Sequence, residues 1–495
     1  MKKLFNFRPI VFCGTFLALG IAASVLTLYV GLAALFVPLA FILVGFAVFS
    51  FSTKTKSFLY YGAIFAAVFF LGFMLEYGSI SFSAIDDGER YSSDYFTGRI
   101  YSVSTADRDG TYRVILSDFD SPVFDAKGTR VTFLTSASGL RKGALVTGYG
   151  SFRKLKQSFE NSYYLSENVS FVSDDTIDLK INSFSDRITD NLSYYVSERI
   201  LEVLPEEQAG VVVALLFGNT DHVESNVFSA YRLSGISHVF AVSGLHIGFF
   251  YAIMALLLKK APLKKWQRAA ICSFSAFVYA TVCSSVSAYR AVIMSFIFGM
   301  SGSFGKKYDF INSIFLSLVA VLTIFPSSLF GVGFLLSYSA VISIALYSST
   351  FKRVFAFMPD KLRDAFAVSL SVVAGTLPIS CVAFGFASVL TVFLNVLIIP
   401  IITVLYSLCF FGVVLLLILG RINLVLYAAN AVIYTIDSLL LAFRHGRFIL
   451  PLVADKILLA VYSINLLATS RRFNLPESVR KVLLMTLPVS ALLLV

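Results

Sequence analysis

Two of the four histidines lie close together in an apolar stretch, beside a serine. His238 and His246 flank Ser243 and Gly244 within residues 237–248. Ser243 and His246 are three residues apart, so one helical face could hold them as a nucleophile and its base, but no third group or oxyanion arrangement is recognisable. The histidines themselves are eight residues apart, about 12 Å along a helix, which argues against a shared metal. The alternative for His246 is a buried imidazole bonded to a helix carbonyl.

A single arginine, Arg290, lies in a second apolar run with no acidic residue near it in sequence. Such a cation is costly at membrane depth and therefore points to function. Its alternatives are snorkelling to the membrane surface or an ion pair with Asp437. Polar residues in the same and later apolar runs are candidates to line a path beside it: Ser284, Ser285, Ser287 and Asn395.

The composition sets the environment of these residues. Of 495 residues, 57% are hydrophobic and only 14% are Asp, Glu, Lys or Arg, whereas soluble proteins carry about 25% charged residues. We expect a polytopic α-helical membrane protein with one small extracytoplasmic all-β, OB-like domain. The expected divisions are N-terminal transmembrane helices over 1–78, the β-domain over 79–180, an amphipathic helix over 181–205 and further transmembrane helices over 206–495.

Apolar runs long enough to cross a membrane predict the helices of both transmembrane parts. The predicted crossings are 9–30, 32–51, 58–77, 239–258, 266–284, 288–303, 310–325, 329–348, 365–384, 389–420, 424–443, 457–468 and 482–495. Residues 211–217 are too short to span. Lys2, Lys3, Arg8, Lys54 and Lys56 predict a cytoplasmic N-terminus, and therefore an external β-domain, by the positive-inside rule.

Residues 79–180 alternate polar and β-forming residues between turn signals. Predicted strands are 95–103, 111–119, 129–135 and 144–152, and their number favours a small closed barrel over a sandwich. Aromatic and basic residues interleave near the last strand as in a face that binds single-stranded nucleic acid: Tyr149, Phe152, Arg153, Lys154 and Lys156. A solvated strand edge is the alternative, because residues 81–180 carry 12 Lys and Arg against 14 Asp and Glu.

The basic excess therefore lies in the membrane part, where 28 Lys and Arg stand against 15 Asp and Glu. There the bases form short clusters at the ends of predicted crossings, as topology signals do. A helix over 181–205, with Phe184, Ile188, Leu192, Tyr195 and Val196 at helical spacing, lies on a surface. The surface is either the β-domain or the outer leaflet.

Several segments in order resemble the ComEC-type channel proteins of bacterial natural competence. Residues 237–248, with Ser243, Gly244 and His246, are similar to that family's "S-G-L-H-x-G" run. Residues 287–294 around Arg290, the basic turn 305–309, the segment 331–341 after Pro326, and the segments 375–378 and 395–400 are similar to further family motifs. The resemblance covers about residues 211–400.

This resemblance implies a channel that passes single-stranded DNA across the bacterial inner membrane during transformation. It implies Arg290, His246, Ser243, Gly244, His238, Asn395 and Ser287 along the DNA path. The implied partners are a DNA receptor, a nuclease and a cytoplasmic ATPase, besides the DNA and the bilayer.

The sequence departs from the family in two ways. The β-domain has no Cys, whereas some members have a disulfide there, and a metal-binding motif is missing. Longer members carry a metallo-β-lactamase-like domain, whose His-x-His-x-Asp-His run this sequence lacks, and four histidines cannot assemble a two-metal centre. No Walker A loop is present. We therefore expect no enzyme activity and no cofactor. The alternatives are an intramembrane enzyme acting on lipid or polymer, which would need a carboxylate or His cluster, and a small-solute transporter, which often shows an internal repeat.

Overall fold

The computed structural model describes residues 8–492 except 31–56, 82–89, 104–110, 124–125, 127–128, 138, 156–161, 185–187, 284, 306, 389, 422, 444–448, 453–454 and 471–475. The described chain forms two compact units. The barrel unit comprises Arg8–Glu198 and Phe315–Gly331, and the helical unit comprises chiefly Arg199–Ile314 and Val332–Val495. The predicted crossing 32–51, Ser284 and Lys156 lie outside the described residues.

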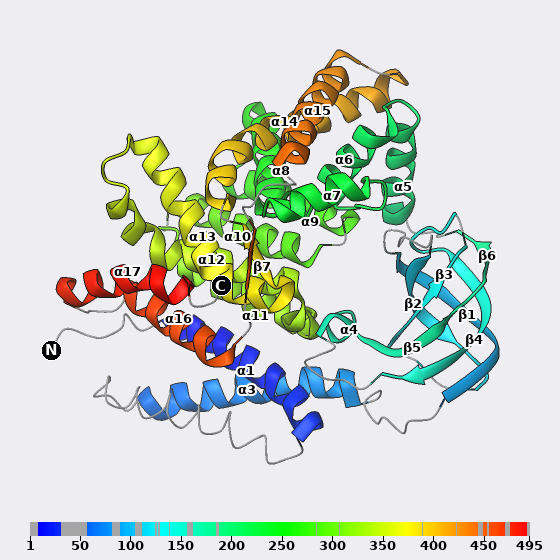
Figure 1. The fold of residues 1–495 in the computed structure, drawn as a ribbon, viewed down its shortest axis with the longest axis horizontal. Helices are drawn as coiled ribbons and strands as arrows, with labels where there is room; N and C mark the ends of the chain where they lie inside the picture. The colour runs from blue at the N-terminus through cyan, green and yellow to red at the C-terminus, as the bar shows by residue number, and fades with distance from the viewer. Residues whose placement is uncertain are drawn as a thin grey trace. The chain divides into compact units, whose positions relative to one another are not determined.

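The β-domain is a closed barrel. Its strands are β1 (Arg90–Val103), β2 (Tyr112–Asp120), β3 (Arg130–Thr135), β4 (Leu145–Lys154), β5 (Val169–Thr176) and β6 (Leu179–Ser183). The order β1-β2-β3-β5-β4 closes on itself because β1 also pairs with β4, and β3 and β5 are parallel. β6 pairs with the first residues of β4, from Leu145 to Gly148, and β5 pairs with its last two. The prediction of a barrel rather than a sandwich is confirmed (Figure 1).

Aromatic rings fill the barrel interior. Phe96, Phe119, Phe133 and Phe152 are nearly fully buried and contact one another at centroid distances of 5.1 to 6.2 Å. Such large rings need space on the facing strand. Gly148 supplies it, since a Cβ there would lie 2.7 Å from the ring of Phe96. Burial of these rings is the main stabilising contribution to this domain.

The helix after the barrel contacts the β-domain. α5 (Ile188–Leu201) carries Tyr194, whose ring centroid lies 3.7 Å from the guanidinium carbon of Arg141 in the β3–β4 loop. The same guanidinium lies 4.4 Å from the ring of Phe184. The sequence leaves open whether this helix lies on the β-domain or on the outer leaflet. In the structure it contacts the β-domain, through cation–π stacking.

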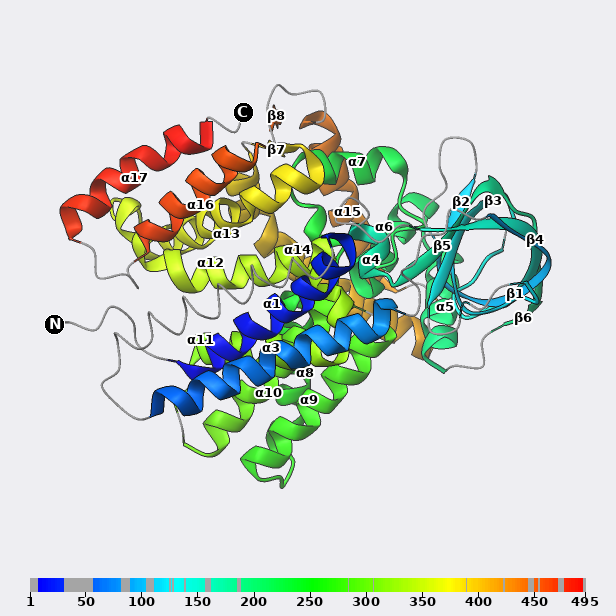
Figure 2. The ribbon, with the colours of Figure 1, turned by 90° about the horizontal axis from the view of Figure 1, so that it is seen from below.

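Two helices pack closely elsewhere in the barrel unit. α1 (Pro9–Val30) and α3 (Ser57–Ser81) run side by side (Figure 2). A Cβ on Gly20 would lie 2.1 Å from the carbonyl oxygen of Phe69, and one on Gly72 would lie 2.4 Å from that of Leu17. Only glycine allows backbones to approach this closely. The short helices α4 (Ser162–Ser166) and η5 (Pro326–Phe330) contact each other in the same unit.

The helical unit contains most of the apolar helices. Its elements are α6 (Glu206–Phe217), α7 (Ser225–Leu233), η3 (Ser237–Val239), α8 (Gly244–Leu257), η4 (Leu258–Lys260), α9 (Lys265–Val282), α10 (Val286–Ser303), α12 (Val332–Val354), α13 (Asp360–Phe384), β7 (Phe386–Ser388), α14 (Thr391–Leu419), α15 (Leu424–Phe443), β8 (Ile449–Pro451), α16 (Lys456–Thr469) and α17 (Glu477–Leu492). α11 (Phe310–Ile324) divides its residues between the two units. α8, α9 and α10 pack on one another, and α12 packs on α13 (Figures 1 and 2).

Six helices in the described part of the chain are long and apolar enough to cross a membrane. They are Pro9–Thr27, Ser237–Lys260, Val332–Val354, Asp360–Phe384, Thr391–Leu419 and Leu424–Ala442. The other predicted crossings that fall on described residues also form helices. Apolar segments of 10–17 residues lie among them, at Ile64–Tyr77 within α3, Phe310–Ile324 and Ile457–Thr469. Residues 211–217 belong to α6, a buried helix of 12 residues. The protein is a multi-pass membrane protein with a β-domain.

Candidate functional site

The span Ser237–Lys260 is broken near its start. The 3-10 turn η3 ends at Val239, and α8 begins only at Gly244. Ser243 is extended, with φ −112° and ψ 179°, and its hydroxyl accepts a hydrogen bond from the backbone N–H of Leu245. This is the behaviour of an N-cap serine, which satisfies amide groups that a helix start leaves open. The break therefore places a helix N-terminus inside an apolar span.

His246 completes this cap. Its Nδ1 accepts a 3.0 Å hydrogen bond from the backbone N–H of Ser243 and lies 3.2 Å from the Ser243 hydroxyl. In the neutral ring the proton is then on Nε2, which is buried and has no hydrogen-bond partner among the described residues. The ring stands edge-on to Tyr406, with centroids 4.6 Å apart. His246 thus occupies the position of the Glu or Gln in a capping box.

Tyr406 connects this cap to two more helices. Its hydroxyl donates to the hydroxyl of Tyr279 at 2.8 Å, and Tyr279 donates to the carbonyl of Leu216. These residues belong to α14, α9 and α6. The start of α8 is therefore held against a hydrogen-bonded aromatic pair.

A second helix begins next to the first. Ser285 is the N-cap of α10, and its hydroxyl accepts from the N–H of Ala288 at 3.4 Å. The same hydroxyl donates to the carbonyl of Val242, one residue before the α8 cap, at 3.1 Å. Two helix N-termini, each with a partial positive charge, are thus tied together by one serine.

Arg290 lies on the first turns of α10, and its side chain is only 6% exposed. Its Nη1 donates to the carbonyl oxygen of Ser337 at 2.6 Å, and its guanidinium carbon lies 5.4 Å from the ring centroid of Tyr338. Both partners are on α12. Within the described chain no carboxylate pairs with Arg290, and its Nε has no hydrogen bond.

The ion pair with Asp437 that the sequence left open is not formed. Asp437, on α15, accepts a 2.9 Å hydrogen bond from the hydroxyl of Tyr231, on α7. Burial first, and then the neighbouring carboxylate, raise the pKa of Tyr231 well above its ordinary value. The tyrosine therefore stays protonated and donates to the acid.

Ser337, whose carbonyl accepts from Arg290, also joins α12 to Ser287 of α10. The hydroxyls of Ser287 and Ser337 are 2.6 Å apart. A Cβ built on Gly244 would lie 3.7 Å from Nη2 of Arg290, so the cation sits beside the first residue of α8. Of the residues predicted from sequence, the structure brings together Ser243, Gly244, His246, Ser287 and Arg290. Ser337 was not among them, although it lies in one of the resemblance segments.

Two other predicted path residues make no hydrogen bond to this group among the described residues. His238 is exposed and lies in η3, before the break. Asn395 lies on α14, where its side chain is 7% exposed and its Oδ1 has no hydrogen-bond partner within the described residues. Their place along a path stays a prediction.

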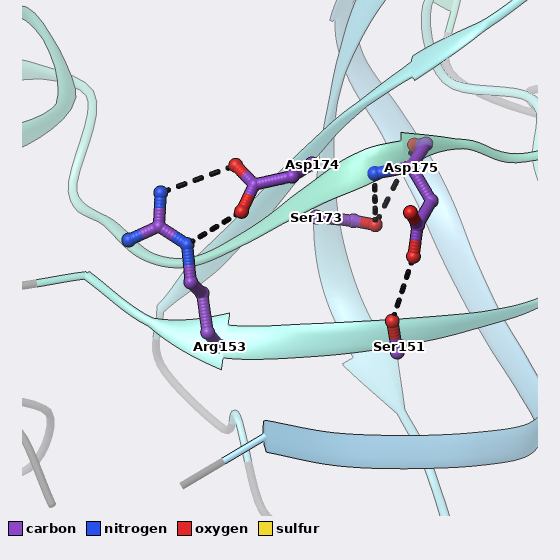
Figure 3. A network of polar contacts seen from close by, with 5 residues as sticks. All are labelled: Ser151, Arg153, Ser173, Asp174 and Asp175. Atoms are coloured by element: carbon purple, nitrogen blue, oxygen red, sulfur yellow. Dashed lines mark hydrogen bonds and ion pairs between the residues drawn. The ribbon is translucent and has the colours of Figure 1, made fainter. Parts of the chain in front are cut away.

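The predicted nucleic-acid face of the barrel does not form as one face. Phe152 is 1% exposed and points into the barrel, because successive residues of a strand point to opposite sides. Tyr149 is 68% exposed, whereas Lys154 is half-buried. Arg153 makes a two-bond ion pair with Asp174, and Ser151 donates to Asp175 (Figure 3). The carboxylates of Asp174 and Asp175 therefore lie next to the side chains of Arg153 and Ser151, where they would repel a phosphate.

Comparison with known proteins places the site in a family. The model of the family described as "Competence protein" matches residues 215–473, a segment that includes α8, α10, α12 and α14. The chain belongs to the competence protein family. No solved structure matches it.

Three relatives match parts of the chain. ComE operon protein 3 of Bacillus subtilis (strain 168) is 30% identical over 200 residues, which are 40% of this chain and 25% of that protein. An uncharacterized protein of Aquifex aeolicus (strain VF5) is 27% identical over 229 residues, 46% of this chain and 52% of the relative. Competence protein ComA of Neisseria gonorrhoeae is 27% identical over 144 residues, 27% and 21% respectively. The chain thus spans about half or less of the length of each relative.

Proposed function

We propose that the protein is an inner-membrane channel that carries single-stranded DNA into the cytoplasm during natural transformation. Membership of the competence family supports a role in DNA uptake, and two of the relatives are named for competence or its operon. The multi-pass architecture supports a path across the bilayer.

The observation that carries the proposal is the buried Arg290 beside a helix N-terminus, without a carboxylate partner in the described chain. A buried cation next to the positive end of a helix is an unfavourable arrangement unless an anion visits it. Half-helix N-termini within a membrane are used in this way for anionic substrates.

The polyanion itself limits the mechanism. At about 3.4 Å per nucleotide of one strand, a bilayer core of about 30 Å would hold roughly nine phosphates. One buried arginine cannot neutralise that many charges. The strand therefore passes through a hydrated lumen lined with hydroxyls, amides and helix ends, and Arg290 acts as one station along it.

The same geometry disfavours the enzyme alternative. The hydroxyl and backbone N–H of Ser243 and the Nδ1 of His246 are all engaged in the cap of α8. A catalytic serine would instead have a base free to take its proton. We propose that the chain is not an enzyme and that a partner or a gradient supplies the energy.

The membrane placement and the partners belong to the same proposal. The basic residues near the N-terminus favour a cytoplasmic N-terminus and a barrel on the outer side, by the positive-inside rule. There the barrel would meet strands delivered by a DNA receptor and a nuclease, while a cytoplasmic ATPase draws the strand inward.

Deletion of the gene tests this function. Entry of labelled DNA into the cytoplasm should be lost, DNA bound at the cell surface should remain, and a plasmid copy of the gene should restore entry. Normal entry of label in the deletion strain would contradict the proposal.

A further inference from the structure

We infer that Gly244 and Arg290 form a binding site for a single phosphodiester oxyanion at the joined starts of α8 and α10. The inference rests on the proposed function and specifies which groups meet the strand. For Gly244, the inference specifies the role of an amide donor to the phosphate.

The start of α8 supplies hydrogen-bond donors for an anion. A helix start leaves its first amide groups without intrahelical partners. The cap uses those of Ser243 and Leu245, whereas the N–H of Gly244 has no hydrogen bond among the described residues. Such open N–H groups at a helix start bind anions.

Arg290 supplies further donors, which do not depend on the helix ends. Arg290 is more than nine-tenths buried, its Nε has no partner, and its Nη2 lies next to Gly244. Only Nη1 is fixed, by the carbonyl of Ser337. A guanidinium held through one nitrogen presents its remaining N–H groups in the planar fork that suits phosphate oxygens.

The site is open on one side. Gly244 and Ser287 are partly exposed, while Arg290, whose Nη2 lies next to Gly244, is buried. An anion can therefore reach the amide from the open side and meet the cation behind it. A passing strand would exchange one phosphate for the next here without a permanent ion pair.

The geometry of Gly244 supplies a discriminating variant. The added methyl of Gly244→Ala would lie 3.7 Å from Nη2 of Arg290 and 3.8 Å from Cβ of Ala291, which are ordinary contacts. Alanine is also the better helix former. The variant should therefore fold, while its methyl occupies the space next to Nη2 of Arg290. Gly248→Ala, one turn later with nothing within 4 Å, is the matched control.

Binding is measured on the full chain in phosphatidylcholine nanodiscs, from the fluorescence anisotropy of a short single-stranded oligodeoxyribonucleotide. Gly244→Ala and Arg290→Gln should each weaken binding about tenfold or more, the loss expected for one hydrogen bond to a charged group. Gly248→Ala should bind as the wild type does. An oligonucleotide with uncharged methylphosphonate linkages should bind equally weakly to all four proteins.

Wild-type affinity in either Gly244→Ala or Arg290→Gln would overturn the site. Melting temperatures of Gly244→Ala and Gly248→Ala show whether a loss of binding reflects unfolding, and Arg290→Gln repeats the test without the glycine change.

Phosphatidylglycerol nanodiscs distinguish the two sources of phosphate, the DNA strand and the lipid headgroup. Loss of oligonucleotide binding to the wild type in those discs would show that lipid occupies the site and overturn its assignment to DNA.

Uptake by cells separates this inference from the function on which it rests. If deletion of the gene abolishes uptake but Gly244→Ala and Arg290→Gln transport DNA normally, the site is wrong and the channel stands. If deletion leaves uptake unchanged, the channel proposal fails, whatever the nanodiscs show.

Discussion

Arg290 defines the chemistry of the site at the scale of single residues. Its charge is buried, its nearest partners are a carbonyl and an aromatic ring, and the neighbouring helix ends are positive. Packing alone would favour an apolar residue at such a position, because a buried charge costs several kcal/mol. We attribute its presence to the passing anion.

Arg290→Ala should therefore abolish DNA uptake, to the level of a deletion strain, while protein abundance stays normal. Arg290→Lys should retain part of the uptake, since it keeps the charge but loses the planar fork. Labelled-DNA entry and immunoblotting of membranes measure both. Wild-type uptake by a well-expressed Arg290→Ala protein would refute the role of this arginine.

Two substitutions at His246 distinguish a helix-capping role from a role as a gate. Gln at the same position can accept the N–H of Ser243 through its amide oxygen, as in an ordinary capping box. His246→Gln should therefore keep stability and uptake, whereas His246→Ala should lose about 0.5–2 kcal/mol of stability with the cap. Melting temperature and uptake are the measurements. Loss of uptake in a stable His246→Gln protein would instead support a gate that needs the imidazole.

At the scale of elements, close helix contacts position the rest of the chain. α1 and α3 cross at two glycines whose Cα atoms lie against backbone carbonyls, and α7 joins α15 through the hydrogen bond from Tyr231 to Asp437. A substitution at either contact should therefore lower the stability of the protein by a predictable amount.

Gly20→Ala should destabilise the protein, because the new Cβ would lie 2.1 Å from a backbone oxygen that cannot move aside. Overpacking of this kind costs about 1–3 kcal/mol. Gly302→Ala, also in a helix but with nothing within 4 Å, should be neutral or slightly stabilising. The purified proteins are compared by their melting temperatures in detergent, and equal values would show that α1 and α3 do not pack as described.

Tyr231→Phe should cost about 1–3 kcal/mol, because it leaves a buried carboxyl without its donor. Asp437→Asn keeps an acceptor oxygen for the tyrosine, so we expect a smaller loss. Thermal unfolding of the two variants tests the order. A larger loss for Asp437→Asn would mean that the charge of Asp437, rather than the hydrogen bond, holds α7 to α15.

For the whole molecule, composition and periodicity predicted the class of fold and the existence of the barrel, since both depend on patterns within short segments. Arg290 was predicted as functional because a lone cation in an apolar run is conspicuous. Ser337 was not, because its contact with Arg290 depends on how α12 packs on α10. Phe152 lies inside the barrel and not on the predicted face, because neighbouring residues of a strand point to opposite sides.

The central claim is that the strand passes the start of α8, and site-specific crosslinking during uptake tests it most directly. A photoreactive residue replaces Ala241, which is exposed within the break, or Phe274, which is 68% exposed on α9. Labelled single strands should crosslink at position 241 and not at position 274. Normal uptake with no crosslink at position 241 would contradict the account.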